Sequence, residues 1–315
     1  MVFPHAHKAK PRRGLIVCGI CLLLTGAIAG LVWRKQTSFA SHAQNADVHR
    51  PKLAVTHPLK WPTDAAAAAI GVEDYGVVAV HGDDKKRPIA SIAKVITCLA
   101  ILQKYPLKPG EDGPTIPITE KDEQLYRDYI AKNGTVVSIK AGVPLTLRQA
   151  VQAMLLPSAN NVADTTAIWA FGSLARYRTY ANAMLQRLEL KDTVVGNDAS
   201  GLDPHTQSTA RDLIKLGELA LKNPVIAKEM ATPQAELPFA GTIVNGNWLV
   251  TRHGFTGIKP GDSNEAGVTL LFSTKHNIGG KNLNLIGVIL GAESYKSSST
   301  GALDLIDSAR QSITP

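Results

Sequence analysis

Ser91 and Lys94 are the first pair of residues in this sequence whose types and spacing could do chemistry. They open an apolar stretch, residues 90–105, whose pattern predicts a buried helix. Residues three apart lie on one face of a helix, so the lysine amine can reach the serine hydroxyl. Burial lowers a lysine pKa and makes the neutral amine available as a general base, and the helix N-terminus points backbone N–H groups at a developing oxyanion. The spacing therefore predicts a serine nucleophile beside its own base.

The alternative for this spacing is a helix-capping serine followed by a lysine that reaches to the surface. Two observations favour the chemical interpretation. Ser-x-x-Lys occurs once in the chain, and Lys94 is the only charged residue between Arg87 and Lys104. A single charge in an apolar helix needs a compensating role, because burying it unpaired is costly.

Ser158 and Asn160 form a second candidate group. They lie in a tight connection between two predicted helices, residues 145–156 and 162–171, and Ser-x-Asn also occurs once. The hydroxyl can pass a proton to a leaving amine, and the amide can bind a substrate carbonyl. A helix-capping serine and a turn asparagine are the structural alternative.

Lys259, Pro260 and Gly261 form a third group, on or beside the first of three strands predicted near the C-terminus. An ammonium and a glycine there could face a substrate carboxylate. The motif is weak by itself, because Lys-x-Gly occurs five times and Lys108-Pro109-Gly110 repeats the tripeptide in a predicted loop. Lys259 is favoured over the other four lysines because it follows the first two groups in the chain and precedes a predicted strand.

Together the three groups resemble the active site of the serine D-alanyl-D-alanine carboxypeptidases, the low-molecular-mass penicillin-binding proteins, whose motifs are S-x-x-K, S-x-N and K-T-G. The resemblance extends over residues 63–312 and includes IKAGVPLTLRQAVQAMLLPSANN, SGLDP and GFTGIKPG. It implies an α/β fold with a five-stranded antiparallel sheet and helices on both sides. It also implies a peptidoglycan stem peptide as substrate and β-lactams as acylating inhibitors.

The resemblance assigns a role to each candidate residue. Ser91 would form the acyl-enzyme, Lys94 would accept its proton, and Ser158 would protonate the departing D-alanine. The substrate would be bound by Asn160, Lys259, Gly261 and the backbone N–H of Asp262, which would complete the oxyanion hole with that of Ser91.

Two departures stand in the third motif. Pro260 replaces the family's threonine and has neither a hydroxyl nor an N–H, which suits an edge strand and weakens substrate binding. Asp262 and Ser263 follow where an aromatic residue or histidine and a threonine are common. An acidic side chain facing a carboxylate subsite would be repulsive.

Composition sets limits on the protein class. The 315 residues suit one large or two modest globular domains, and the net charge of +8 is spread along the chain without a base-reading motif, which argues against nucleic-acid binding. Cys18, Cys21 and Cys98 lie in apolar segments, so we expect no disulfide. No zinc-binding spacing occurs, and we predict no metal and no cofactor.

Residues 14–33 contain no charge and are long enough to cross a bilayer. We expect a single-pass membrane anchor after a cytoplasmic tail, residues 1–13, although a cleaved signal sequence, which would give a secreted protein, remains the alternative. Residues 34–60 are expected to be a polar linker, and residues 61–315 an extracytoplasmic catalytic domain. The positive charges that flank the span favour this orientation only weakly.

Within the domain, strands are predicted over residues 65–74, 75–82, 247–254, 267–275 and 283–291. Helices are predicted over residues 90–105, 145–156, 162–171, 180–188, 209–223 and 302–311, and Ser208 is the predicted N-cap of the helix over 209–223.

Three other activities fit parts of the pattern. A D,D-endopeptidase would use the same residues, so the sequence does not separate it from a carboxypeptidase. A serine β-lactamase is less favoured, because no Glu-x-x-Leu-Asn loop occurs between Asn160 and Lys259. A weakly active wall-binding protein, handicapped by Pro260, is the third alternative.

Overall fold

The structure is a computed structural model, and it describes residues 53–250, 252 and 254–314. The predicted tail, the span over residues 14–33 and most of the linker lie outside the described residues. No helix in the described part of the chain is long and apolar enough to cross a bilayer.

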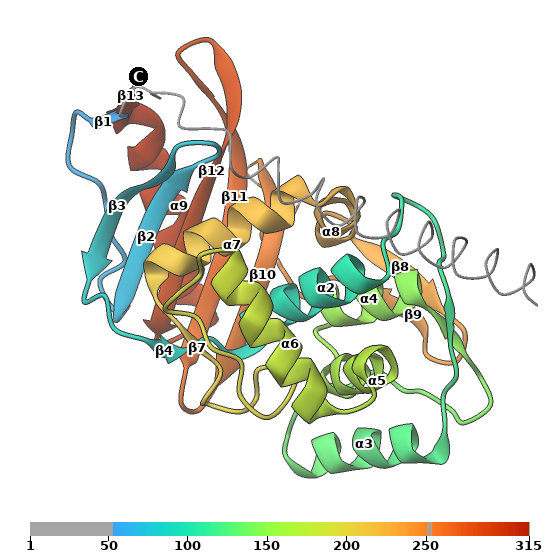
Figure 1. Ribbon diagram of the computed structural model, residues 1–315. Helices are drawn as coiled ribbons and strands as arrows, with labels where there is room; N and C mark the ends of the chain where they lie inside the picture. The colour runs from blue at the N-terminus through green and yellow to red at the C-terminus, as the bar shows by residue number, and fades with distance from the viewer. Residues whose placement is uncertain (1–52, 251, 253, 315) are drawn as a thin grey trace, which may run out of the picture. The chain divides into compact units, whose positions relative to one another are not determined.

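A five-stranded sheet forms one half of the described domain (Figure 1). All neighbouring strands run antiparallel, which confirms the predicted sheet. In spatial order its strands are β10 (Phe255–Ser263), β11 (Gly267–Ile278), β12 (Lys281–Ala292), β2 (Ala67–Val72) and β3 (Gly76–Gly82). The two early strands and the three late ones therefore form one sheet, with β10 at its edge.

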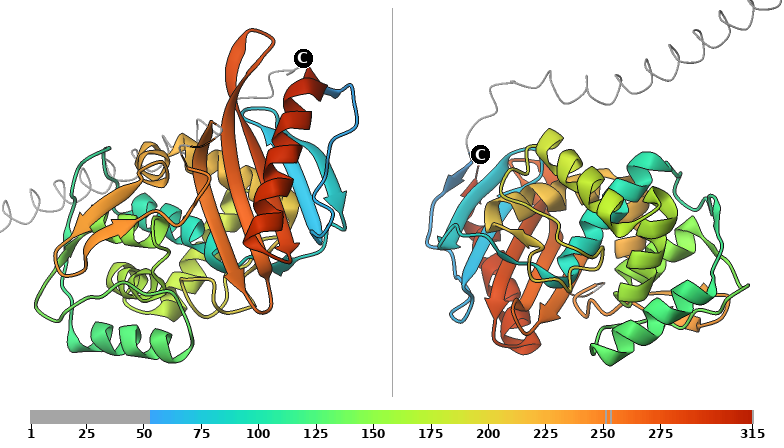
Figure 2. Two further views of the ribbon diagram at one scale, coloured as in Figure 1. Left: turned by 180° about the vertical axis from the view of Figure 1, so that it is seen from behind. Right: turned by 60° about the horizontal axis from the view of Figure 1, so that its bottom comes forward.

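Helices cover both faces of the sheet. Helix α9 (Tyr295–Ser312) lies across one face, and α7 (Ala210–Lys222) lies across the other (Figures 1 and 2). Strand β2 is buried on both faces: Ala68 and Ile70 pack in the α9 core, and Ala67 and Ala69 pack in the core on the α7 side. This burial explains why the strand is a continuous apolar run rather than an alternating one.

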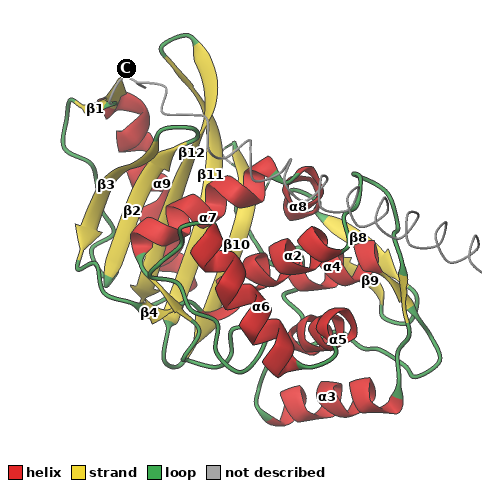
Figure 3. Cartoon of the chain, viewed as in Figure 1, coloured by secondary structure: helices red, strands yellow, loops and turns green. Residues whose placement is uncertain are grey.

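A helical region packs against the α7 side of the sheet (Figure 3). Its central helix, α2 (Ala93–Lys104), is buried over almost its whole length, as its sequence predicts. Around it lie α3 (Glu120–Ala131), α4 (Leu147–Leu155), α5 (Asn160–Phe171), α6 (Leu174–Arg187) and α8 (Pro224–Met230). Helices α3 and α8 were not predicted, because α3 is polar over most of its surface and α8 is short.

Outside the main sheet, the described residues form four pairs of short strands, and each strand has two or four residues. They are β1 (Ala54–Val55) with β13 (Ile313–Thr314), β4 (Arg87–Pro88) with β7 (Gln207–Ser208), β5 (Thr115–Ile116) with β6 (Leu145–Thr146), and β8 (Gln234–Leu237) with β9 (Gly241–Val244).

The folded part of the chain begins before the predicted boundary at residue 61. Strand β1 pairs with β13, and the Lys60 N–H donates to Ser308 Oγ at 2.9 Å. Leu59 packs against the α9 core. The last residues assigned to the polar linker therefore belong to the domain. Their few apolar side chains contact residues that are distant in sequence.

Two local predictions are wrong. The strand predicted over residues 247–254 is wrong for residues 247–250: Asn247 Oδ1 accepts from the Leu249 N–H at 3.2 Å, which bends the chain into a turn. Strand β10 begins at Phe255. The N-cap of α7 is Thr209, which accepts from the Asp212 N–H at 3.3 Å, whereas Ser208 lies in β7.

Candidate active site

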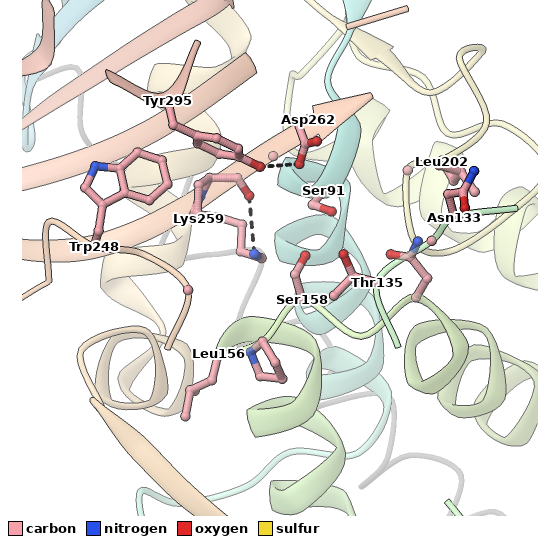
Figure 4. Close-up of a pocket in the computed structure, with 17 residues that line it drawn as sticks. Ser91, Asn133, Thr135, Leu156, Ser158, Leu202, Trp248, Lys259, Asp262 and Tyr295 are labelled. Atoms are coloured by element: carbon pink, nitrogen blue, oxygen red, sulfur yellow. Dashed lines mark hydrogen bonds between the residues drawn. The ribbon is translucent and has the colours of Figure 1, made fainter. Parts of the chain in front are cut away.

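The predicted site residues meet in a pocket of about 480 Å³ between the edge strand β10 and the helical region (Figure 4). Every residue predicted for catalysis or substrate binding lines it except Lys94, which lies behind Ser91. The lining members are Ser91, Ser158, Asn160, Lys259, Gly261 and Asp262. The structure therefore brings together three motifs that are spread along the chain from Ser91 to Gly261.

Ser91 lies in a short 3-10 turn, η1 (Ala90–Ile92), that leads directly into α2. Ile89 and Ile92, on either side of it, are fully buried, so they anchor the turn in the core. Ala90 has a φ of 46°, a left-handed conformation that is uncommon outside glycine. The packed neighbours hold this backbone and present the serine hydroxyl to the pocket.

Lys94 is completely buried and holds three oxygen atoms together. Its Nζ donates to Ser91 Oγ at 2.8 Å, to Asn160 Oδ1 at 2.6 Å and to the Ser200 carbonyl at 2.9 Å. Burial, and secondarily the nearby charge of Lys259, hold the Lys94 pKa well below its ordinary value. A lysine with a lowered pKa gives up its proton more readily than an exposed lysine, and the neutral amine can then accept one from the serine.

Ser158 and Asn160 lie where the sequence places them, at the connection between α4 and α5. Ser158 has a φ of 73°, and its buried Oγ has no hydrogen-bond partner among the described residues. Figure 4 shows this hydroxyl pointing toward the space between the Lys259 amine and Ser91. A buried polar atom without a partner in the free protein is available to a substrate.

Lys259 lies on the edge strand, within β10, and is 1% exposed. Its Nζ donates to the Pro260 carbonyl at 3.2 Å, and burial lowers its pKa to about 7. By contrast, Lys108-Pro109-Gly110, the second copy of the tripeptide, ends in a turn outside the pocket. The choice of Lys259 among the five Lys-x-Gly sites agrees with this placement.

Gly261 lets β10 approach the nucleophile. A Cβ at this position would lie 2.7 Å from the Ser91 nitrogen and 2.9 Å from Thr269 Oγ1. Real Cβ atoms do not come so close to backbone, so glycine is required for the strand to lie against the turn that carries Ser91. This close approach brings the backbone of Asp262, the next residue, beside the same turn.

Gly261→Ala is therefore expected to move Ser91 or β10 and to slow acylation by about 10²-fold, the effect of displacing a reacting group by about 1 Å. Gly246→Ala is the matched control: it lines the same pocket, and its new Cβ would make only an ordinary 3.6 Å contact with the Leu156 carbonyl. Stopped-flow acylation rates of both variants check this. Equal rates in the two variants would contradict the packing argument.

A buried polar network behind Lys94 was missed by the sequence analysis. Asp164 accepts from the Tyr129 hydroxyl at 2.7 Å and from the Ala199 N–H at 2.8 Å. Ser200, the next residue, gives its carbonyl to Lys94. Helix α3, helix α5 and the loop around Ser200 are thereby fixed to the catalytic lysine. Asp164 and Tyr129 belong to no recognisable motif, and their contact depends on how α3 packs against α5.

This network predicts a pH-dependent stability. Burial raises the Asp164 pKa from 3.8 to about 6, so the folded protein holds this proton more tightly than the unfolded chain does. The free energy of unfolding contributed by Asp164 should fall by about 3 kcal/mol as the pH rises through this range. Urea unfolding at several pH values checks this, and Asp164→Asn should flatten that part of the profile. If Asp164→Asn showed the same pH dependence of the unfolding free energy as the wild type, a group other than Asp164 would cause it.

One end of the pocket is formed by residues that were not predicted, Trp248 and Tyr295. The Tyr295 hydroxyl donates to Asp262 Oδ1, and the Trp248 ring meets the Tyr295 ring edge-on at 4.8 Å (Figure 4). Trp248 lies in a turn that was predicted to be a strand. Tyr295 is the first residue of α9, which begins several residues before its predicted start. Neither position carries a motif of its own.

Comparison with known proteins agrees with this geometry. A sequence model of the peptidase S11 family, described as D-alanyl-D-alanine carboxypeptidase, matches residues 56–294. The chain belongs to this family. The match confirms the predicted resemblance and the predicted class of enzyme, a serine D-alanyl-D-alanine carboxypeptidase.

Individual relatives cover most of the domain. A D-alanyl-D-alanine endopeptidase of Haemophilus influenzae is 27% identical over 248 residues, which are 76% of this chain and 81% of that protein. A D-alanyl-D-alanine carboxypeptidase structure from Mycobacterium tuberculosis is 27% identical with a TM-score of 0.68, and covers 82% of this chain and 96% of that one. The Streptomyces K15 DD-transpeptidase structure, at 21% identity and a TM-score of 0.69, covers 80% and 98% and shares the fold.

Proposed function

We propose that this peptidase removes the terminal D-alanine from peptidoglycan stem peptides through an acyl-enzyme on Ser91. The observation that carries the proposal is the 2.8 Å contact between Ser91 Oγ and the buried Lys94 amine. No other serine hydroxyl in the described part of the chain has a hydrogen bond to a buried lysine amine. The expected product is free D-alanine, which chiral amino-acid analysis detects after incubation with a D-Ala-D-Ala peptide. Absence of D-alanine release by protein that still acylates Ser91 would contradict the carboxypeptidase assignment.

The acylation step follows from the geometry. Ser91 Oγ attacks the carbonyl carbon between the two D-alanines and gives its proton to the neutral Lys94 amine. The backbone N–H groups of Ser91 and Asp262 stabilise the negative charge on the carbonyl oxygen. The C–N bond then breaks, and the unpartnered Ser158 hydroxyl delivers a proton to the departing amine. A proton then returns to Ser158 from the pair of buried lysines, Lys94 and Lys259.

Deacylation returns the enzyme to its starting state. Water attacks the acyl-enzyme ester, loses a proton to the site's base, and releases the shortened peptide while Ser91 Oγ is reprotonated. Asn160 holds the acyl donor through its side-chain amide, and its Oδ1 simultaneously keeps Lys94 in place. β-Lactams would follow the same acylation step and leave more slowly, and would thus act as inhibitors.

A D,D-endopeptidase activity is the second candidate. It is favoured by the similarity to a Haemophilus influenzae protein that is named an endopeptidase. The same residues would attack a D-alanyl bond within a cross-link rather than at a free chain end. Digestion of cross-linked muropeptide dimers separates the two: conversion to monomers supports the endopeptidase, and D-alanine release supports the carboxypeptidase.

Pro260 is proposed to limit carboxypeptidase turnover. It stands on the edge strand, as expected for a residue without an N–H, and it offers no hydroxyl beside Lys259 for a substrate carboxylate. Pro260→Thr should therefore raise kcat/KM for a D-Ala-D-Ala peptide by about tenfold, the gain from one well-placed hydrogen bond to a charged group. Pro109→Thr, in the identical tripeptide outside the pocket, is the control. An unchanged or lower kcat/KM in Pro260→Thr would show that Pro260 does not limit turnover.

We further propose that the domain acts outside the cytoplasm, held by the apolar segment at residues 14–33 or secreted after its cleavage. The support is the uncharged length of that segment and the location of peptidoglycan outside the membrane. Protease added to intact cells should digest the domain if this is correct. Protection in intact cells, together with digestion after lysis, would contradict it.

A further inference from the structure

The pocket has an arm on the side of Ser91 that faces away from Trp248 (Figure 4). Two segments of chain border it, and we call this space the acyl arm. Residues 133–135, directly after α3, form the α3 wall, and residues 198–203 form the loop wall. The residues of the two walls that line the pocket are Asn133, Gly134, Thr135, Gly201 and Leu202.

The acyl arm is where the part of the substrate that stays on Ser91 extends. In the proposed mechanism the leaving D-alanine presents its carboxylate to Lys259, which lies on the Trp248 side of Ser91 (Figure 4). The rest of the stem peptide lies on the other side of the bond that breaks. It therefore extends between the two walls.

Each wall is hydrogen-bonded to a residue of the catalytic group. In the α3 wall, the Thr135 carbonyl accepts from the Asn160 N–H at 2.8 Å. In the loop wall, the Ser200 carbonyl accepts from Lys94 Nζ at 2.9 Å. A displacement of either wall therefore moves a group that takes part in acylation.

The loop wall also presses on the turn that carries Ser91. Asp198 Oδ1 shapes this loop, because it accepts from the N–H groups of Ser200 at 2.8 Å and Gly201 at 2.6 Å. A Cβ on Gly201 would lie 2.1 Å from the Ala90 carbonyl, so glycine is required for this approach. The position of the loop wall is thus coupled to that of the nucleophile as well as to that of its base.

Behind the arm, the Asp164 carboxylate joins the two walls. Its Oδ2 accepts from the Tyr129 hydroxyl at 2.7 Å, and the Tyr129 carbonyl accepts from the Gly134 N–H of the α3 wall at 2.8 Å. Its Oδ1 accepts from the Ala199 N–H of the loop wall at 2.8 Å. Asp164 is 3% exposed and Tyr129 is 5% exposed, so loss of either link would leave a buried polar group without its partner.

We propose that Asp164 is a positioning residue that couples the acyl arm to the catalytic lysine, so that stem-peptide residues bound in the arm increase the rate of acylation. The inference rests on the proposed function, because that function places the acyl part of the substrate in the arm. Asp164 itself exchanges no proton and touches no substrate. Binding energy from a remote part of a substrate can be used to orient the reacting groups, and a shortened substrate then loses kcat.

Two peptides test the proposal, diacetyl-L-Lys-D-Ala-D-Ala and acetyl-D-Ala-D-Ala, which lacks the lysine residue that would fill the arm. The full chain in detergent is incubated with each, and D-alanine release is followed by mass spectrometry to obtain kcat and KM separately. We expect the wild-type kcat for the long peptide to exceed that for the short one by about 10²-fold.

Variants of Asp164 separate coupling from a general structural role. Asp164→Ala removes both links, so kcat for the long peptide should fall by about 10²-fold, to nearly that of the short peptide, while kcat for the short peptide changes little. Asp164→Asn keeps an oxygen for the Ala199 N–H and an amide for the Tyr129 hydroxyl, so it should keep most of the long-to-short ratio.

Tyr129→Phe is a milder variant, for use if Asp164→Ala does not fold. It cuts the link to the α3 wall alone and should lower the long-to-short ratio of kcat by about tenfold. Tyr126→Phe is the matched control, because this partly buried tyrosine of the same helix has its hydroxyl 3.4 Å from Ser138 Oγ, away from Asp164. Its ratio should equal that of the wild type.

Two results would overturn the inference. One is a wild-type kcat that is the same for both peptides. The other is a variant series in which Asp164→Ala or Tyr129→Phe slows both peptides by the same factor, because a residue that only stabilises the fold would act in that way. Failure of the proposed function looks different, since the wild type would then release D-alanine from neither peptide.

Discussion

Ser91→Ala is expected to abolish hydrolysis of D-alanyl peptides, with a loss in kcat of at least about 10⁴-fold, as removal of the nucleophile does in serine hydrolases. Alanine cannot form the acyl-enzyme, and water bound in its place would lack the orientation given by Lys94. The fold should remain, since the turn is held by the buried Ile89 and Ile92. D-Alanine release from a D-Ala-D-Ala peptide measures the loss.

The control for this variant is Ser138→Ala, at a half-buried serine that does not line the pocket. Its activity should equal that of the wild type. Residual turnover of Ser91→Ala within tenfold of the wild-type rate would contradict covalent catalysis by this serine. Equal thermal unfolding of the two variants would show that the difference is chemical.

Lys94→Met is expected to slow penicillin acylation by about 10³-fold, which is the usual contribution of a positioned general base. Methionine fills the same buried space without a charge, but it leaves Asn160 Oδ1 and the Ser200 carbonyl without their donor. A loss of stability is therefore expected as well, by about 2 kcal/mol. Acylation rates from stopped-flow fluorescence, with circular dichroism as a check of the fold, measure both effects.

The wild-type pH profile should be bell-shaped. At low pH both buried lysines are protonated and Lys94 cannot accept the serine proton, so the rate falls. At high pH Lys259 loses its charge, because its pKa is about 7, and the rate falls again. The two apparent values belong to the coupled pair. Lys94→Met should lose the acidic limb, whereas Lys104→Met, at an exposed lysine on the same helix, should keep it. An acidic limb retained by Lys94→Met would assign the base to another group.

The sequence contains the parts of this site that depend on local spacing. Ser91 and Lys94 are three residues apart on one helical turn, so their contact follows from helix geometry. The apolar runs that form β2 and α2 also follow from pattern, since both are buried on nearly all sides. Placement of Lys259 needed the family resemblance, because Lys-x-Gly occurs elsewhere in the chain.

Contacts between distant segments could not be predicted in the same way. Asp164, Tyr129 and Ser200 meet only because α3, α5 and a loop pack together. The start of α9 at Tyr295 was missed, because Ser297, Ser298 and Ser299 carry no apolar period. Asn247 turned a strand-like sequence into a bend through side-chain hydrogen bonds that compete with the sheet.

The most direct test of the account is covalent labelling of the protein with a fluorescent penicillin, followed by intact mass and peptide mapping. The account predicts one adduct per chain, located on the peptide that contains Ser91 and absent from Ser91→Ala. An adduct on a different serine, or folded protein that forms none, would contradict the assignment of Ser91 as the nucleophile.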